Sequence, residues 1–234
     1  MPATKKIKAC IFDMDGLLLD TETIYSAVTN KILEPYGKTF PLETKLKMMG
    51  RDVRTATDIL LKDLALPLTF EEYDNKATEL KEVFFREAQF MPGAERLIRH
   101  LASNSIPIAV ATSSAKAMFL IKTDKHRAVF ELFGSNITCG DDPEVKRSKP
   151  SPDIFLAAMR RLDSELRPED CLVFEDASNG IEAANNAQMS SIWVHDMRFS
   201  LDPPSETIAH DATERIASLE DFAPEKYGLP PFKE

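Results

Sequence analysis

The sequence predicts an α/β fold, in which a parallel sheet covered by helices on both faces is interrupted by an inserted all-helical segment. Three observations lead to this prediction. Short apolar runs without polar alternation recur along the chain, as in strands that are buried on both faces. Segments of helical periodicity separate these runs, which is typical of parallel strands joined by helices. Residues 20–90 carry helical patterns but no convincing buried strand.

The first predicted strand, KACIF (8–12), is followed by the helical insertion. Apolar residues recur there at helical spacing over 24–32, 53–64 and 70–84. Thr69 and Glu72 form a capping box that begins the last of these helices. The Pro-Gly pair within 91–95 marks the return of the chain to the sheet. The predicted domains are therefore a core of residues 1–19 and 91–234 and a helical unit of residues 20–90.

The rest of the chain alternates between predicted helices and strands. Helical stripes are present in residues 93–103, 151–162 and 178–188. The predicted strands are IPIAVA (106–111), CLVFE (171–175) and SIWVH (191–195), with NITCG (136–140) as a weaker candidate. Ligands of such sheets bind at the carboxyl ends of the strands, so the polar residues that follow the apolar runs are expected at one edge.

Composition narrows the class of partner. The 29 Lys and Arg residues against 38 Asp and Glu give a formal net charge of −9, which provides no long-range attraction to a nucleic acid polymer or an anionic membrane. No apolar run reaches the roughly 18 residues of a membrane span, and the first ten residues lack the apolar stretch of a signal peptide. The expected location is therefore cytoplasmic. The three widely spaced cysteines are expected to be buried thiols.

Asp13 and Asp15 follow the first strand and precede Gly16. A turn that begins at the glycine lets both carboxylates face one cleft. Such a pair suits Mg²⁺, which prefers oxygen ligands, and it suits a division of labour between a nucleophile and a proton carrier. Taken alone, the two residues fit a solvated turn equally well.

Three further clusters follow later apolar runs. Thr112, Ser113 and Ser114 lie where a strand end opens a helix, a position that binds anions or simply caps the helix. Lys149 fits either a charge that neutralises a phosphoryl group or a surface lysine. Glu175 and Asp176 fit either a metal site or a helix N-terminus. Together the clusters supply the positioning, charge neutralisation and proton movement that phosphoryl transfer requires.

Four segments, in this order, carry a family resemblance: DMDGLLLDT (13–21), VATSS (110–114), SKPSPDIF (148–155) and VFEDASNGIEAA (173–184). They resemble the four motifs of the haloacid dehalogenase superfamily of phosphatases. The resemblance implies a Rossmann-like core, and it places residues 20–90 where one branch of the superfamily inserts a helical cap. Within the superfamily the chain is most similar to the eukaryotic phosphatases that act on pseudouridine 5'-phosphate.

The resemblance also implies roles for the catalytic and metal-binding residues. Asp13 would be the nucleophile that forms an aspartyl phosphate, and Asp15 the general acid and base. Lys149 would bridge the nucleophile and the phosphate. Asp13, the backbone carbonyl of Asp15 and Asp176 would bind Mg²⁺, with Glu175 in or next to that shell.

For substrate binding, the resemblance implies that Thr112 and Ser113 hold the phosphoryl oxygens. Thr21 would lie near the hinge of the cap. Arg51 is a candidate substrate contact from the cap, because related capped enzymes use a basic residue just after this glycine. A solvated arginine at a helix start is an equally good interpretation of Arg51.

The expected activity is Mg²⁺-dependent hydrolysis of a small phosphomonoester by a monomeric enzyme, with pseudouridine 5'-phosphate as the expected substrate. Tyr25 stands where the sugar-phosphate mutases of this branch have a histidine, which favours phosphoryl transfer to water. Ser148 and Ser178 differ from the glycine and proline expected in the pseudouridine-specific enzymes, which leaves the substrate open. The alternatives are a sugar or polyol phosphate phosphatase of broad specificity and a non-catalytic regulatory protein of the same fold.

Overall fold

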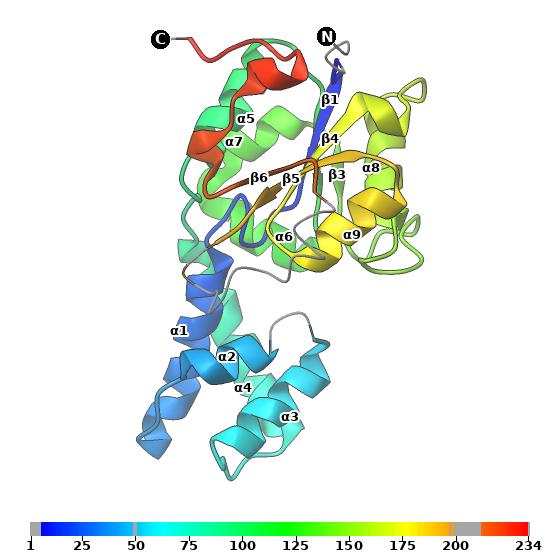
Figure 1. The fold of residues 1–234 in the computed structure, drawn as a ribbon. Coiled ribbons are helices and arrows are strands. Elements are labelled where there is room, and N and C mark those ends of the chain that lie inside the picture. Colours follow the sequence, from blue (N-terminus) through cyan, green and yellow to red (C-terminus); the bar gives the residue numbers. More distant parts are fainter. Residues whose placement is uncertain (1–5, 49–50, 197, 199–211, 234) are drawn as a thin grey trace.

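The computed structural model of the chain describes residues 6–48, 51–196, 198 and 212–233. Within these ranges, parallel strands form one sheet in the order β3-β2-β1-β4-β5-β6 (Figure 1). The strands are β1 (Ala9–Phe12), β2 (Ile108–Ala111), β3 (Ile137–Thr138), β4 (Cys171–Glu175), β5 (Ser190–Val194) and β6 (Glu214–Ile216). All the predicted strands are confirmed. β6 was not predicted, because it is three residues long and contains two charged residues.

The register places the end of β1 at the centre of the sheet. Phe12 pairs with Val110 on β2 and with Phe174 on β4. The backbone N–H of Asp13 continues the pairing by donating to the carbonyl of Phe174 at 3.0 Å. The segments that follow β1, β2 and β4 therefore lie next to one another.

Helices cover both faces of the sheet (Figure 1). They are α5 (Ala94–Ser103), α6 (Lys116–Thr123), α7 (Arg127–Phe130), α8 (Asp153–Leu162) and α9 (Ser178–Asn186). Alternate residues of β1 enter different apolar clusters, as the two-residue period of a strand requires. Cys10 and Phe12 pack with α5 and α7, whereas Ala9 and Ile11 pack with α8 and α9. The α/β fold prediction is thus confirmed.

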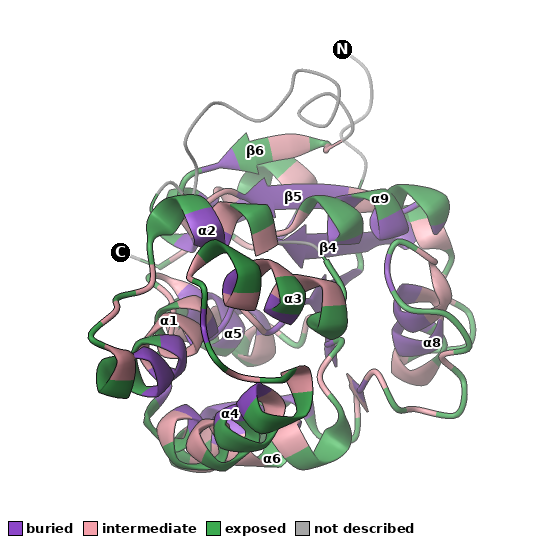
Figure 2. Cartoon of the chain, turned by 90° about the horizontal axis from the view of Figure 1, so that it is seen from below, coloured by how far each residue is buried: buried purple, intermediate pink, exposed green. Residues whose placement is uncertain are grey.

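The segment after β1 forms helices with an apolar cluster of their own. These are α1 (Thr21–Leu33), α2 (Leu42–Met48), α3 (Val53–Asp63) and α4 (Phe70–Phe84). Their cluster consists of Val28, Ile32, Leu33, Leu60, Leu66, Tyr73 and Ala77. The capping box of α4 is present, with Thr69 and Glu72 as its two members. The sequence patterns did not single out α2. Figure 1 places these four helices beyond one end of the sheet, and from below exposed residues predominate on α3 and α4 (Figure 2).

Single 3-10 turns connect several elements and pack the C-terminal segment. They occupy Glu34–Tyr36, Phe85–Glu87, Asp124–His126, Glu131–Phe133, Pro168–Asp170, Leu219–Asp221 and Pro224–Tyr227. The three cysteines are buried and unpaired, as predicted. Among the described helices, none is long and apolar enough to cross a membrane.

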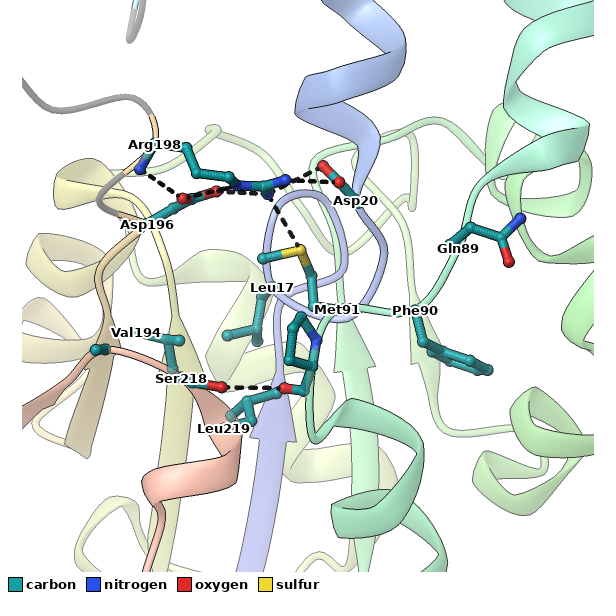
Figure 3. Close-up of a pocket in the computed structure, with 12 residues that line it drawn as sticks. Leu17, Asp20, Gln89, Phe90, Met91, Val194, Asp196, Arg198, Ser218 and Leu219 are labelled. Atoms are coloured by element: carbon teal, nitrogen blue, oxygen red, sulfur yellow. Dashed lines mark hydrogen bonds and ion pairs between the residues drawn. The ribbon is translucent and has the colours of Figure 1, made fainter.

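Two chain segments join the helical unit to the sheet, and they pair with each other. The N–H of Asp20 donates to the carbonyl of Gln89, and the N–H of Met91 donates to the carbonyl of Leu18, both at 2.9 Å. A cavity of about 490 Å³ lies beside this connection (Figure 3). There, Arg198 forms ion pairs with Asp20 at 2.8 Å and with Asp196 at 2.7 Å, so a loop of the sheet domain contacts the start of α1 (Figure 3).

Candidate active site

Asp13, Lys149 and Glu175 form a buried charge cluster at the carboxyl ends of the central strands. The ammonium of Lys149 lies 2.6 Å from Oδ1 of Asp13 and 2.6 Å from Oε1 of Glu175, and it also donates to the carbonyl of Ala111 at 3.2 Å. All three charged side chains are less than a tenth exposed. Charges removed from water are stable only when they are paired and hydrogen-bonded, so the cluster fixes each member.

Neighbouring charges change the titration of this cluster. Burial raises the pKa of Asp13 to about 7; Lys149 opposes that shift, and the carboxylates of Glu175 and Asp15 add to it. Burial by itself lowers the pKa of Lys149, but Asp13 and Glu175 more than offset this effect and raise the pKa above its ordinary value. Lys149 therefore remains a cation beside Asp13.

Asp176 adds a third carboxylate. Ligand oxygens of Asp13, Glu175 and Asp176 all lie within 4.8 Å of one another. Burial, and then the charges of Glu175 and Asp13, raise the pKa of Asp176 well above its ordinary value. Within the described residues, no hydrogen bond reaches the carboxylate of Asp176, whereas its backbone carbonyl accepts a bond from Trp193 Nε1 at 2.8 Å. Three close carboxylates against one lysine fit a hard divalent cation such as Mg²⁺.

Two glycines make room for these carboxylates. Gly16 has φ +80°, and a Cβ there would overlap the carboxylate of Asp176. A Cβ at Gly180, in the first turn of α9, would overlap the carboxylate of Glu175. Glu175 also accepts hydrogen bonds from the N–H groups of Asp176 and Ala177, at 3.1 and 3.0 Å. The glycines therefore permit an arrangement that any larger residue would exclude.

Asp15 lies in a second polar cluster. Its Oδ2 accepts hydrogen bonds from the hydroxyls of Thr112, at 3.2 Å, and Ser114, at 2.9 Å. Its Oδ1 lies 2.5 Å from the ammonium of Lys122, which also donates to the Ser114 hydroxyl at 2.9 Å. Burial raises the pKa of Asp15, but Lys122 and the hydroxyls outweigh burial and bring the pKa below its ordinary value.

The structure brings together most of the site residues predicted from the sequence; three of them, Thr21, Ser113 and Arg51, form none of the hydrogen bonds of the two clusters that the described residues make. Thr21 is fully buried at the start of α1 and helps to lower the pKa of Asp15, although its hydroxyl makes no hydrogen bond of ordinary geometry. Ser113 is exposed at the rim, next to the buried Thr112. Arg51 is exposed in the helical unit, where its Nε donates to the carbonyl of Lys47 at 2.7 Å. Arg51 therefore does not contact the two carboxylate clusters.

The sequence motifs missed Lys122, and they placed Ser114 in the predicted anion-binding cluster without predicting its contact with Asp15. Lys122 belongs to the ordinary helical pattern of α6, in which a lysine predicts a solvated position. The signal for its burial lies only in its apolar neighbours within KAMFLIKT (116–123), such as Phe119, which packs into the core. Ser114 extends the hydroxyl row of the VATSS segment.

Comparison with known proteins identifies the family. The family model for haloacid dehalogenase-like hydrolases matches residues 7–188. The chain belongs to the haloacid dehalogenase-like hydrolases. Its relatives include a "probable pseudouridine-5'-phosphatase" of Drosophila melanogaster, which is 47% identical over 97% of this chain and 96% of that protein. A (DL)-glycerol-3-phosphatase of Arabidopsis thaliana is 44% identical over 96% of this chain and 74% of that protein.

A solved structure supports the same assignment. A Thermotoga maritima protein assigned as a β-phosphoglucomutase superposes with a TM-score of 0.75 and 29% identity, over 95% of this chain and 97% of that protein. As a member of the haloacid dehalogenase-like hydrolases with relatives named as phosphatases, this protein is a phosphoric monoester hydrolase. The relatives described above as phosphatases are named for small phosphorylated metabolites.

Proposed function

We propose that this haloacid dehalogenase-like phosphatase hydrolyses its substrate through a phosphoryl group carried on Asp13. The single observation that carries this proposal is the buried contact of Asp13 with Lys149, 2.6 Å apart at the centre of the sheet edge. A carboxylate attacks phosphorus best when nearby positive charge offsets the repulsion between two anions. Lys149 supplies that charge, and Glu175 holds Lys149 from the other side.

In the first step, an oxygen of Asp13 forms a bond to phosphorus and the bond to the substrate oxygen breaks. Asp15 donates a proton to the departing alcohol; since Lys122 favours the ionised form of Asp15 in the free site, Asp15 acquires this proton once the anionic phosphate is bound beside it. In the second step, Asp15 takes a proton from a water molecule, which attacks the phosphorus and releases inorganic phosphate and free Asp13. Before the first step, the hydroxyl of Thr112 and the rim residue Ser113 would bind the phosphoryl oxygens of the substrate.

Asp13 and Asp176 are proposed to hold Mg²⁺ together with the backbone carbonyl of Asp15, and Glu175 supports them. The close carboxylates support this proposal, as does the Asp176 carboxylate, which accepts no hydrogen bond from the described residues. The bound ion would neutralise charge on the phosphoryl oxygens. Gly16 keeps the approach of Asp176 to the backbone open.

We propose that residues 20–90 act as a cap that covers the site and excludes water during the reaction. The apolar cluster of α1, α3 and α4 supports this view, since its buried members all come from the helical unit and none from the sheet. Thr21 and the paired connection near Leu19 would form the hinge. A cavity of about 300 Å³ in the cap is lined in part by Tyr25, Tyr73 and Arg51, which together offer rings and a cation to a polar substrate.

Pseudouridine 5'-phosphate is the proposed substrate, because a relative named for that activity covers nearly the whole chain at 47% identity. Glycerol 3-phosphate is the second candidate, because relatives named for it reach 44% and 43% identity. Because the two sequence identities differ by only a few percent, both substrates are tested, pseudouridine 5'-phosphate first.

The test is a phosphate-release screen over nucleotides, sugar phosphates and polyol phosphates with Mg²⁺ present. We expect the highest kcat/KM for pseudouridine 5'-phosphate. A wide preference for glycerol 3-phosphate would make glycerol 3-phosphate the assigned substrate instead.

Asp13→Asn should reduce turnover of every substrate by at least about 10³-fold, because the nucleophile is lost. The circular dichroism spectrum should be unchanged, and an Asp13→Asn variant that still hydrolyses phosphate esters at the wild-type rate would contradict the proposed chemistry.

A further inference from the structure

Lys122 is a fully buried cation that the proposed chemistry leaves unused. Its side chain on α6 has no exposed surface, and it donates to Oδ1 of Asp15 and to the hydroxyl of Ser114. A buried ammonium has a high desolvation cost, which only close partners offset. A lysine at this position therefore requires a reason beyond the packing of α6.

Lys122 also contacts residues outside the sheet domain. Its ammonium lies 4.5 Å from the ring centroid of Phe85 and 5.5 Å from that of Tyr25. The two rings pack edge to face, with centroids 5.0 Å apart. Tyr25 belongs to α1, and Phe85 follows directly after α4. Cation–π contacts of this kind hold an ammonium over a ring face, so Lys122 connects Asp15 to both ends of the helical unit.

The position of Lys122 differs from that of Lys149. Lys149 contacts Asp13 and Glu175, whereas Lys122 contacts Asp15 and the hydroxyl of Ser114. Each of the two proposed catalytic carboxylates thus has its own buried ammonium, and the two lysines come from different elements. Without Lys122, Oδ1 of Asp15 would lose the only hydrogen bond that the described residues give it.

We propose that Lys122 is a positioning residue for Asp15, which it holds in the orientation for proton transfer and links to the helical unit through Tyr25 and Phe85. This inference rests on the proposed role of Asp15 as general acid and base. Proton transfer by a side chain requires that it lie within hydrogen-bond reach of the reacting oxygen, so loss of its anchor reduces the rate even when the carboxylate remains.

The test compares two leaving groups in single-turnover experiments with enzyme in excess. 4-Nitrophenolate leaves without a proton, whereas an alkoxide needs one. The two substrates are 4-nitrophenyl phosphate and an alkyl phosphate. The alkyl phosphate is either pseudouridine 5'-phosphate or glycerol 3-phosphate, whichever the wild-type enzyme hydrolyses faster. Lys122→Met should reduce release of the alcohol by about 30- to 100-fold and release of 4-nitrophenolate by less than about 3-fold, since general acid catalysis contributes about 10²- to 10⁴-fold.

Lys125→Met is the matched control, because this nearby lysine is exposed and, among the described residues, pairs with Glu87 alone. It should leave both rates unchanged. Lys122→Gln serves as a second variant if Lys122→Met fails to fold, because its amide can still donate to Asp15. This variant should show the same selectivity with a smaller loss.

Asp15→Asn separates failure of the inference from failure of the proposed function. If Asp15→Asn selectively slows the alkyl ester but the Lys122 variants slow both esters equally, or neither, the positioning role is wrong and the role of Asp15 stands. If Asp15→Asn slows both esters equally, the proposed role of Asp15 is wrong, and the inference falls with it.

Discussion

Gly180 lies so close to the Glu175 side chain that it leaves no space for a larger residue. It lies in the first turn of α9, where alanine would normally favour the helix by about 0.5–1 kcal/mol. The carboxylate of Glu175 occupies the space that a Cβ would need. Glu175 in turn holds Lys149, so a displacement at Gly180 reaches Asp13 through two hydrogen bonds.

Gly180→Ala is therefore expected to destabilise the protein by about 2 kcal/mol, because overpacking outweighs the gain in helix propensity. Phosphate release should fall as well, since Glu175 would shift and Lys149 with it. Urea unfolding and the phosphate-release assay measure the two effects. Asn179→Ala, at the exposed neighbouring position, is the control and should change the free energy of unfolding by less than about 0.5 kcal/mol. A Gly180→Ala variant as stable and active as the wild type would show that Glu175 has room to move.

Individual site residues differ in how far the sequence could predict them. Asp13, Asp15, Glu175 and Asp176 directly follow apolar strands, so their place at the sheet edge follows from local pattern. Lys122 does not have such a signal. Its side chain is buried because Asp15, Tyr25 and Phe85 surround it, and these residues lie far from it in the sequence.

Among the elements, α4 was predicted most completely, since both its periodicity and its start are local. The hydroxyl of Thr69 accepts from the N–H of Glu72 at 3.1 Å, and the Glu72 carboxylate accepts from the N–H of Thr69 at 2.8 Å. Such reciprocal bonds depend on residues three apart. In contrast, β6 forms only because its residues add to the edge strand β5, a contact that local sequence cannot reveal.

Thr69→Ala should lower the free energy of unfolding of the helical unit by about 1 kcal/mol, because the first turn of α4 loses its side-chain cap. Chemical denaturation monitored by circular dichroism measures the change. Thr69→Ser keeps the hydroxyl and is the matched control, with an expected loss well below that of alanine. Equal stability of the two variants would mean that the capping bond contributes nothing to the folded state.

Over the whole molecule, the site concentrates negative charge at the centre of the sheet edge. Asp13, Glu175 and Asp176 are three carboxylates against the one ammonium of Lys149, which leaves an excess of two negative charges when all are ionised. Burial raises the pKa values of Asp13 and Asp176 most, and the repulsion among these carboxylates adds to the rise. A divalent cation bound there would reduce the repulsion among these carboxylates in the folded state, and not in the unfolded chain.

Mg²⁺ is therefore expected to raise the thermal unfolding midpoint, with a stabilisation of about 2.7 kcal/mol at one hundred times the dissociation constant. Asp176→Asn should remove most of this increase, because it removes one proposed ligand. Differential scanning fluorimetry with and without Mg²⁺ provides a readout that is independent of turnover. Asp58→Asn, an exposed acid on α3, is the control and should retain the full increase. A Mg²⁺ effect of equal size in both variants would place the ion elsewhere.

The sequence by itself determined the α/β class, the strands β1 to β5 and the group of acids and a lysine at their carboxyl ends. These features depend on periods of two and 3.6 residues and on the rule that parallel strands end at one edge, so neighbouring residues suffice. Only the tertiary structure decided which charges pair: Lys149 with Asp13 and Glu175, and Lys122 with Asp15. The physical reason is that the pairing of a buried charge depends on distance in space, and here the partners are separated by 26 to 136 residues along the chain.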